Sequence, residues 1–204
     1  YLTVKGKSCH GAHPEGGIDV LPPACAIVSG LQTIVTRNLP ATTPAIITVG
    51  RFHSGTANNI VSGEAKLGGI LRTFDLSLRE SIKQRIRKMA EDTAAAYGAS
   101  CEVVFEDSYP SLKNSDTLFD LLTPVMEEAF GKDNIVYADV PSLGADDFAY
   151  FTQGYQGFYF NLGTHDPQSD ACFPLHNEHF APQEEALRIG MLAELVGIYT
   201  ILTT

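Results

Sequence analysis

No stretch of the 204-residue chain approaches the roughly 18 to 20 consecutive apolar residues that a membrane-spanning helix needs. The chain also lacks a basic segment followed by an apolar run, which is the pattern of a secretory signal peptide. With 44% hydrophobic and 19% charged residues, the composition is that of an ordinary globular protein. We therefore expect a soluble chain with no membrane partner.

Cysteine is scarce and widely spaced. The four cysteines, Cys9, Cys25, Cys101 and Cys172, form no C-x-x-C pair, which disfavours a disulfide framework and a cysteine-rich zinc site. The sequence has no G-x-S-x-G motif and no phosphate-binding glycine loop, because the glycine pair in LGGIL lies inside a predicted strand. The cysteine pattern fits a reducing compartment, and we expect the cytoplasm.

Positive charge is in short supply, and the shortage is confined to one half of the chain. The formal net charge is −10, yet residues 1–112 hold 11 Lys and Arg against 10 Asp and Glu, whereas residues 113–204 hold 3 against 14. An acidic half repels phosphates, so we expect no nucleic-acid partner. The acid excess also fits an ordinary solvated surface. The asymmetry predicts two units.

The first half has the periodicity of a compact α+β unit. The pattern predicts helices at 19–37 and about 78–97, and strands at 1–7, 44–55, 64–74 and 100–107. The order strand, helix, strand, strand, helix, strand is the ferredoxin-like βαββαβ arrangement, a four-stranded antiparallel sheet with two helices on one face. The segments 5–17 and 56–63 are expected to be loops.

The pattern changes after residue 110. Helices are predicted at 117–131, at 146–154 and at 182–204, with a single strand at 157–163. A lone strand has no sheet to pack on, so we expect this half to belong to a larger sheet whose other strands are not in this chain. We predict one domain over 1–110 and a segment of another over 111–204.

Four of the six histidines fall in two pairs, His10 with His13 and His176 with His179. Nearby glycine and proline exclude a regular helix that would aim both members of a pair at one metal. A zinc site needs about three or four protein ligands, so each pair is incomplete. Each pair is therefore either a solvated polar loop or half of a site completed elsewhere, and a site built from all four histidines is a weaker possibility.

Six segments, in this order and spacing, resemble one superfamily: KGKSCHGAHPEGGIDVLPPACAIVSGLQTIVTR, TVGRFHSGTANNIV, GGILRTF, YPSLKN, LGADDFAYF and LHNEHF. They are similar to zinc-dependent amidohydrolases and metallopeptidases that include aminoacylase, hippurate hydrolase, carboxypeptidases and plant auxin-conjugate hydrolases. The resemblance implies an α/β catalytic domain interrupted by a ferredoxin-like lid and dimerisation domain. Residues 1–110 would be the lid domain and residues 111–204 the C-terminal part of the catalytic domain, with the N-terminal segment absent.

The resemblance also implies roles for single residues. His10 matches the lid histidine, supplied in several members by the partner subunit, that polarises the scissile carbonyl. Asn59 and Arg72 match the residues that hold the substrate's free carboxylate, which suits the planar fork of arginine. His176 matches a metal ligand. Without the resemblance, the sequence predicts that Arg72 is a surface residue at the end of a strand and that Asn59 forms part of a turn.

An acidic pair and a further histidine can also be compared with the family. Asp146 and Asp147 stand where the family has an acidic pair near the metal, with Asp146 replacing a longer glutamate; a helix N-cap is an equal alternative for it. His13 falls where the family varies and is expected to be a solvated residue or to lie outside the ligand shell.

The function implied is hydrolysis of the amide bond of an N-acyl amino acid or dipeptide by a homodimeric enzyme. The complete enzyme would use zinc, or another divalent metal such as manganese or cobalt, and most of its metal ligands would lie in the absent segment. The alternative is an isolated dimerisation or binding module that catalyses nothing and binds no metal.

Overall fold

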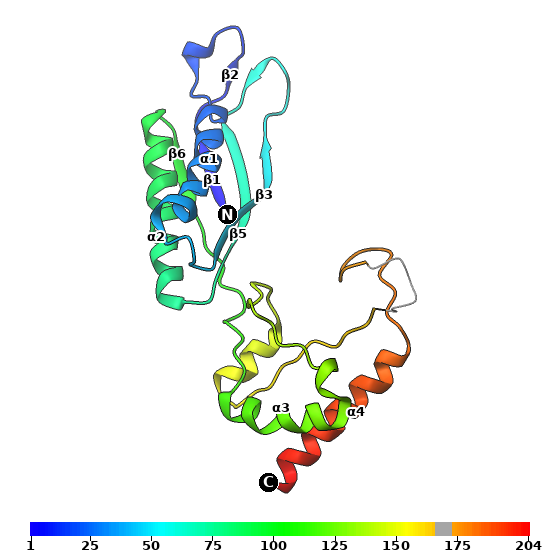
Figure 1. Ribbon diagram of the computed structural model, residues 1–204. Coiled ribbons are helices and arrows are strands. Elements are labelled where there is room, and N and C mark those ends of the chain that lie inside the picture. Colours follow the sequence, from blue (N-terminus) through cyan, green and yellow to red (C-terminus); the bar gives the residue numbers. More distant parts are fainter. Residues whose placement is uncertain (166–172) are drawn as a thin grey trace. The chain divides into compact units, whose positions relative to one another are not determined.

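A computed structural model describes residues 1–165 and 173–204, so Cys172 lies outside the described residues. The chain divides into two compact units, unit 1 from Tyr1 to Ser111 and unit 2 from Leu112 to Thr204 (Figure 1). The described cysteines, Cys9, Cys25 and Cys101, are all free.

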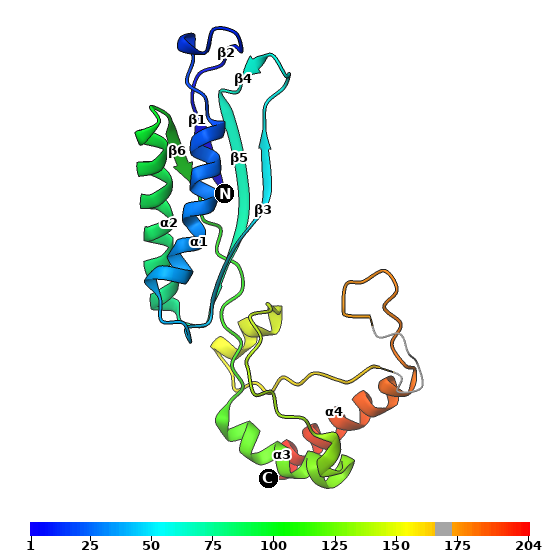
Figure 2. The ribbon, with the colours of Figure 1, turned by 45° about the horizontal axis from the view of Figure 1, so that its top comes forward.

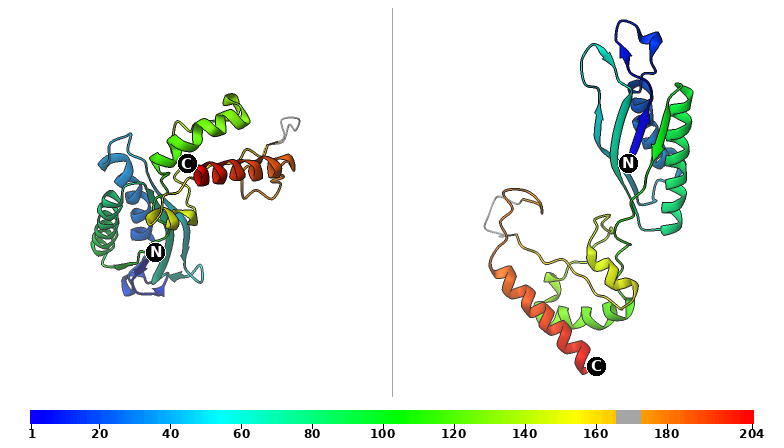
Figure 3. Two further views of the ribbon diagram at one scale, coloured as in Figure 1. Left: turned by 90° about the horizontal axis from the view of Figure 1, so that it is seen from below. Right: turned by 180° about the vertical axis from the view of Figure 1, so that it is seen from behind.

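Unit 1 is an antiparallel sheet covered on one face by two helices. The strands follow the order β3-β5-β1-β6, which is the ferredoxin-like order. Figures 2 and 3 show both helices on the same face of the sheet. The fold class predicted from the sequence is therefore confirmed. The elements are β1 (Leu2–Lys5), α1 (Leu21–Asn38), β3 (Ala45–Ser54), β5 (Glu64–Thr73), α2 (Leu76–Ala96) and β6 (Ser100–Val103).

The core of unit 1 follows from two apolar periods. In β1, Leu2 and Val4 are buried, whereas the alternate residues Thr3 and Lys5 are not, so one face of the strand meets the helices. Both helices bury residues spaced three or four apart, which places these side chains on one stripe. The buried residues on these stripes are Ala24, Ile27, Leu31 and Ile34 of α1 and Ile82, Ile86, Ala90 and Ala94 of α2, and Pro23 of α1 is also buried.

Capping fixes where α2 begins. The Asp75 carboxylate accepts hydrogen bonds from the amides of Ser77 at 2.7 Å and Leu78 at 3.0 Å, which satisfies two of the free N–H groups of the first turn. These hydrogen bonds favour the ionised form and lower the pKa of Asp75.

Two segments expected to be loops pair into a small second sheet. β2 (Cys9–His10) and β4 (Ile60–Val61) are antiparallel, and a 3₁₀ turn, η1 (Pro14–Gly16), follows β2. Figure 2 shows β2 and β4 beyond the end of β5. We call residues 6–19 and 55–63 together the arm. Its strands have two residues each, which is too short for a recognisable sequence period.

Unit 2 contains two α-helices and two 3₁₀ helices among its described residues: α3 (Asp116–Phe130), η2 (Lys132–Asn134), η3 (Asp147–Gln153) and α4 (Glu185–Thr203). The helices α3 and α4 contact each other, and Gly197 of α4 leaves room for the Met126 side chain of α3. The Ser115 hydroxyl caps α3 by accepting from the Leu118 amide.

The strand predicted at 157–163 is not formed. This segment is extended but unpaired, and Asn114 holds it by donating to the Tyr159 carbonyl at 2.8 Å and accepting from the Tyr159 amide at 2.7 Å. A strand requires a neighbouring strand for its backbone hydrogen bonds, and the described part of unit 2 offers none. That residues 157–163 pair with a strand outside this chain therefore stays a prediction.

The terminal helix α4 is exposed and apolar. By length and composition it is the one helix in the described part of the chain that could cross a membrane, and 17% of its apolar window is buried. A core helix of a soluble protein passes the same test, so the finding alone does not indicate a membrane protein. Five of its exposed apolar side chains recur at helical spacing: Leu187, Met191, Leu195, Ile198 and Leu202.

Candidate functional site

The arm brings two of the candidate residues together. His10 pairs in register with Ile60, the residue after Asn59, and the Gly11 amide donates to the Asn59 carbonyl at 2.7 Å. A Cβ on Gly11 would come within 3.0 Å of that carbonyl oxygen, so the close approach of the two segments favours glycine. Both His10 and Asn59 are exposed, which leaves their side chains available to a ligand.

A backbone hydrogen bond favours one tautomer of the neutral His10 ring. The Ala12 amide donates to His10 Nδ1 at 3.1 Å. An amide nitrogen can only donate, so Nδ1 must be unprotonated, and a neutral imidazole then carries its proton on Nε2. The imidazole is thereby prepared to donate a hydrogen bond from Nε2 to a ligand oxygen.

His13 lies close to His10 on the arm. The two rings are 5.9 Å apart at their centroids, and His13 Nδ1 lies 3.6 Å from the Glu15 carboxylate. Both partners of that contact are about three-quarters exposed. Such an exposed pair contributes little to stability, which fits a solvated residue.

Arg72 lies at the other end of β5 from the arm. It is half-buried and pairs with Ile46 of β3, whereas the arm joins the sheet at Glu64. Arg72 is eight positions after Glu64, which corresponds to roughly 25 Å of strand. Within the described residues the Arg72 side chain has no ion pair or hydrogen bond. One protomer therefore does not bring Arg72 and Asn59 to the same carboxylate.

His176 has an unusual backbone in unit 2. It lies in a turn in which the Asn177 amide donates to the Pro174 carbonyl, and its φ is 67°. It is the one non-glycine residue in the described part of the chain with a positive φ. Histidine reaches this region more readily than most residues, and backbone outliers concentrate at functional sites. Its side chain is exposed.

Asp146 caps the 3₁₀ helix η3. Its carboxylate accepts from the Phe148 amide at 2.9 Å and from the Tyr159 hydroxyl at 3.2 Å. Burial, followed by this hydrogen bond, raises the pKa of Tyr159. Asp147 is exposed in the first turn of the same helix. The structure thus assigns Asp146 a local structural contact, and a role near a metal stays a prediction for both aspartates.

The described residues do not by themselves form a metal centre. Among them, no three His, Cys, Asp or Glu side chains lie close enough to hold one ion. His10 and His13 lie in unit 1, and His176 and His179 lie in unit 2 together with Asp146 and Asp147. An exposed imidazole such as that of His176 suits zinc as a single ligand. The remaining ligands would have to come from elsewhere.

Unit 2 also has an open cavity of about 290 Å³. Its wall is aromatic and aliphatic, and Glu194 contributes one carboxylate. The lining residues come from the unpaired segment and from α4, together with η3: Phe148, Phe158, Tyr159, Phe160, Leu162, Gly190 and Glu194. The cavity therefore borders both the segment that lacks a strand partner and the exposed helix.

Comparison with known proteins identifies the family. The model of the M20 peptidase dimerisation domain matches residues 1–98. Thermostable carboxypeptidase 1 of Saccharolobus solfataricus is 33% identical over 193 residues, which cover 94% of this chain and 48% of the carboxypeptidase. N-acetylcysteine deacetylase of Bacillus subtilis is 31% identical over 199 residues, which cover 97% of this chain and 50% of the deacetylase.

Solved structures agree with these relatives. The YXEP protein of Bacillus subtilis, a dinuclear metal binding peptidase from the M20 family, has a TM-score of 0.70 at 26% identity and covers 98% of this chain and 50% of its own. A tripeptidase of Staphylococcus aureus, at 21% identity, shares the fold with a TM-score of 0.76, over 98% of this chain and 50% of its own.

Residues 1–98 match the M20 peptidase dimerisation domain, and the relatives that match more than nine-tenths of this chain are carboxypeptidases and deacetylases of the M20 family. The superfamily resemblance read from the sequence is confirmed. The chain spans about half the length of the curated relatives that it matches.

Proposed function

We propose that this chain is part of a metal-dependent amidohydrolase that cleaves the amide bond of an N-acyl amino acid or a dipeptide. Residues 1–110 would form the lid and dimerisation domain, and residues 111–204 the C-terminal segment of the catalytic domain. The relatives named above are a carboxypeptidase and an N-acetylcysteine deacetylase, and both names describe amide hydrolysis next to a carboxylate.

One observation carries the proposal most directly: the arm presents His10 as an Nε2–H donor beside Asn59. Amide hydrolysis places negative charge on the carbonyl oxygen, and a fixed donor aimed at that oxygen stabilises the transition state. Because the Ala12 amide occupies Nδ1, the neutral ring offers Nε2–H to that oxygen. Asn59, on the same arm, would donate to the substrate without adding charge.

The metal would be held in part by His176. When bound, the metal supplies an activated water and polarises the carbonyl. Zinc would suit an imidazole ligand, and manganese or cobalt would depend on the ligands supplied from outside this chain. The other ligands and the general base would come from a segment not present in this chain, which is consistent with the incomplete ligand set among the described residues.

We further propose that the active site is shared between two protomers. Arg72, whose guanidinium has no partner among the described residues, can hold a carboxylate bidentately, but it lies roughly 25 Å along β5 from the base of the arm. An N-acyl amino acid is too short to reach both ends of the sheet. The substrate would therefore meet Arg72 of one protomer and His10 and Asn59 of its partner.

The homodimer would form on the α1 and β3 side of unit 1. Helix α1 has no charged residue from Leu21 to Thr36, whereas the exposed face of α2 is densely charged. Depletion of charge marks the centre of protein interfaces. Strand β3 is an edge of the sheet with unpaired backbone groups, which a second copy can pair.

The alternative is a dimerisation or binding module without activity of its own. The incomplete ligand set of the described residues favours it for the chain in isolation. Hippurate hydrolysis separates the two functions. We expect the 204-residue chain alone to be inactive and the complete polypeptide to hydrolyse hippurate or another N-acyl amino acid when supplied with a divalent metal. A complete polypeptide that binds metal and dimerises yet cleaves no N-acyl amino acid or dipeptide would favour the binding module.

The cellular location of the protein and the absence of nucleic-acid and membrane partners stay predictions. We propose a cytoplasmic protein without nucleic-acid or membrane partners, supported by its acidic charge and by free cysteines at positions 9, 25 and 101.

A further inference from the structure

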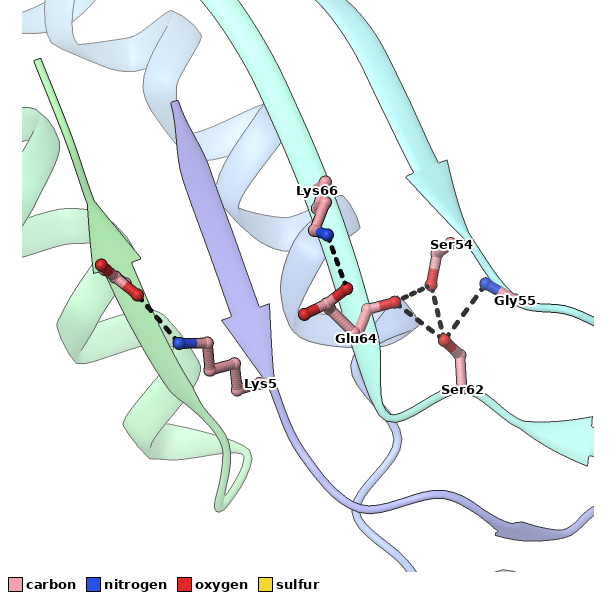
Figure 4. A network of polar contacts seen from close by, with 7 residues as sticks. Lys5, Ser54, Gly55, Ser62, Glu64 and Lys66 are labelled. Carbon is pink, nitrogen blue, oxygen red and sulfur yellow. Dashed lines mark hydrogen bonds and ion pairs between the residues drawn. The ribbon is translucent and has the colours of Figure 1, made fainter.

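Ser62 is the one buried polar residue in the described part of the chain, with 7% of its surface exposed. Its Oγ lies 2.8 Å from Ser54 Oγ and 2.9 Å from the Glu64 carbonyl oxygen, and it accepts from the Gly55 amide at 3.2 Å. Ser54 Oγ also lies 2.8 Å from the Glu64 carbonyl. Figure 4 shows these groups converging where β3 and β5 meet the arm.

The protons of this cluster can be placed in two ways. Either Ser54 donates to Ser62 and Ser62 donates to the Glu64 carbonyl, or Ser62 donates to Ser54 and Ser54 donates to that carbonyl. In both cases every hydroxyl proton is used and the carbonyl is satisfied. Only Ser62 accepts from the Gly55 amide, so the two serines are not equivalent.

The chain passes between the sheet and the arm at four points, and each of them either is hydrogen-bonded to Ser62 or Gly63 or consists of these two residues. The chain enters the first part of the arm at Gly6, whose amide donates to the Gly63 carbonyl at 2.9 Å. It leaves that part at Val20, whose amide donates to the Ser62 carbonyl at 3.3 Å. It enters the second part at Gly55, whose amide donates to Ser62 Oγ, and leaves it at Ser62 and Gly63 themselves.

We propose that Ser62 is a positioning residue that fixes the orientation of the arm and hence of His10. The inference rests on the proposed function for its catalytic consequence, but the mechanical part concerns this chain alone. A displacement of about 1 Å at a catalytic group can cost about a hundredfold in rate. Losing the side chain that joins β3, β5 and the Gly55 turn would permit such a displacement.

Amide hydrogen exchange in the 204-residue chain tests the mechanical part. We expect Ser62→Ala to speed exchange at the Gly6, Gly11 and Gly55 amides by about tenfold or more, because local opening governs exchange. Amides of β1 and β5 should keep their protection, which checks that the sheet is intact. Ser54→Ala is the matched control: Ser62 can still donate to the Glu64 carbonyl and accept from Gly55, so exchange should change by less than about threefold.

Kinetics of the complete polypeptide test the catalytic part. Ser62→Ala should lower kcat for hippurate by about tenfold or more, and in a His10→Ala background the same change should lower kcat by less than about threefold, because the two residues act through one group. Equal losses in both backgrounds would show a general structural effect and would overturn the proposal.

Two other outcomes also decide the matter. Unchanged exchange at the arm amides in Ser62→Ala would overturn the mechanical part whatever the kinetics. An inactive wild-type polypeptide would overturn the proposed function, and the catalytic consequence with it, while faster arm exchange would still identify Ser62 as the residue that fixes the arm.

Discussion

At the scale of single residues, His10 illustrates how a backbone contact defines a side chain's chemistry. An exposed histidine is usually free to place its proton on either nitrogen. Here the amide two residues later occupies Nδ1, so the neutral ring carries its proton on Nε2. His13, three residues further along the chain, lacks such a contact and instead lies near a carboxylate.

The first prediction concerns these two histidines. In the complete polypeptide, His10→Ala should lower kcat for an N-acyl amino acid by about a hundredfold or more, because the change removes a donor to the developing oxyanion. His13→Ala, the matched control, should leave kcat within about threefold, since an exposed ion pair contributes little. Steady-state kinetics would measure both. A His10→Ala enzyme within about threefold of wild-type would refute the oxyanion role.

The second prediction concerns His176. His176→Ala should abolish hydrolysis and reduce the metal bound per complete polypeptide, because one imidazole ligand is lost. His179→Ala should leave the metal content unchanged, since His179 contacts Glu178 and Phe173 in the same exposed region. Metal analysis after dialysis would compare the two. Full metal content and activity in His176→Ala would remove it from the ligand set.

At the scale of elements, the sequence predicted most of unit 1 but not the arm. The alternation of Leu2 and Val4 and the helical spacing of Ile82 and Ile86 are local patterns, and they identify a strand and a helix without knowledge of the rest. Strands β2 and β4 have two residues each, and their pairing depends on contacts between segments about fifty residues apart. No local pattern encodes such a contact.

The candidate residues likewise divide into those that the sequence identifies and those that only the fold reveals. Motif matching selected His10, Asn59 and Arg72, but only the register of β2 with β4 and of β3 with β5 shows that the first two are neighbours and the third is remote. Ser62 carries no motif at all. Its burial and its hydrogen bonds exist only in the fold, so sequence reasoning had no signal for it.

The third prediction concerns α4. Leu195 is 62% exposed in this chain, within the exposed apolar stripe, and we expect the absent catalytic segment to cover it. Leu195→Ala should change the unfolding free energy of the 204-residue chain by less than about 0.5 kcal/mol. In the complete polypeptide the same change should cost about 2 kcal/mol or more, because a buried leucine is then lost. Urea denaturation would measure both values. Equal effects in both proteins would mean that α4 stays uncovered.

At the scale of the whole molecule, the distribution of candidate residues supports the proposal of an active site shared by two copies of the chain. His10 and Asn59 lie on the arm and Arg72 lies at the far end of β5, so one protomer offers half of the substrate-binding set at each end of its sheet. A dimer formed on the uncharged α1 face would give each site one half from each protomer. The acidic half of the chain, residues 113–204, would lie in the catalytic domain.

Subunit mixing of the complete polypeptide tests this arrangement most directly. His10→Ala and Arg72→Ala homodimers should each be nearly inactive. After dissociation and random reassociation, half of the dimers would be mixed, and each mixed dimer would hold one intact site, so activity should return to about a quarter of the wild-type value. No recovery beyond that of the separate variants would contradict a site shared between protomers.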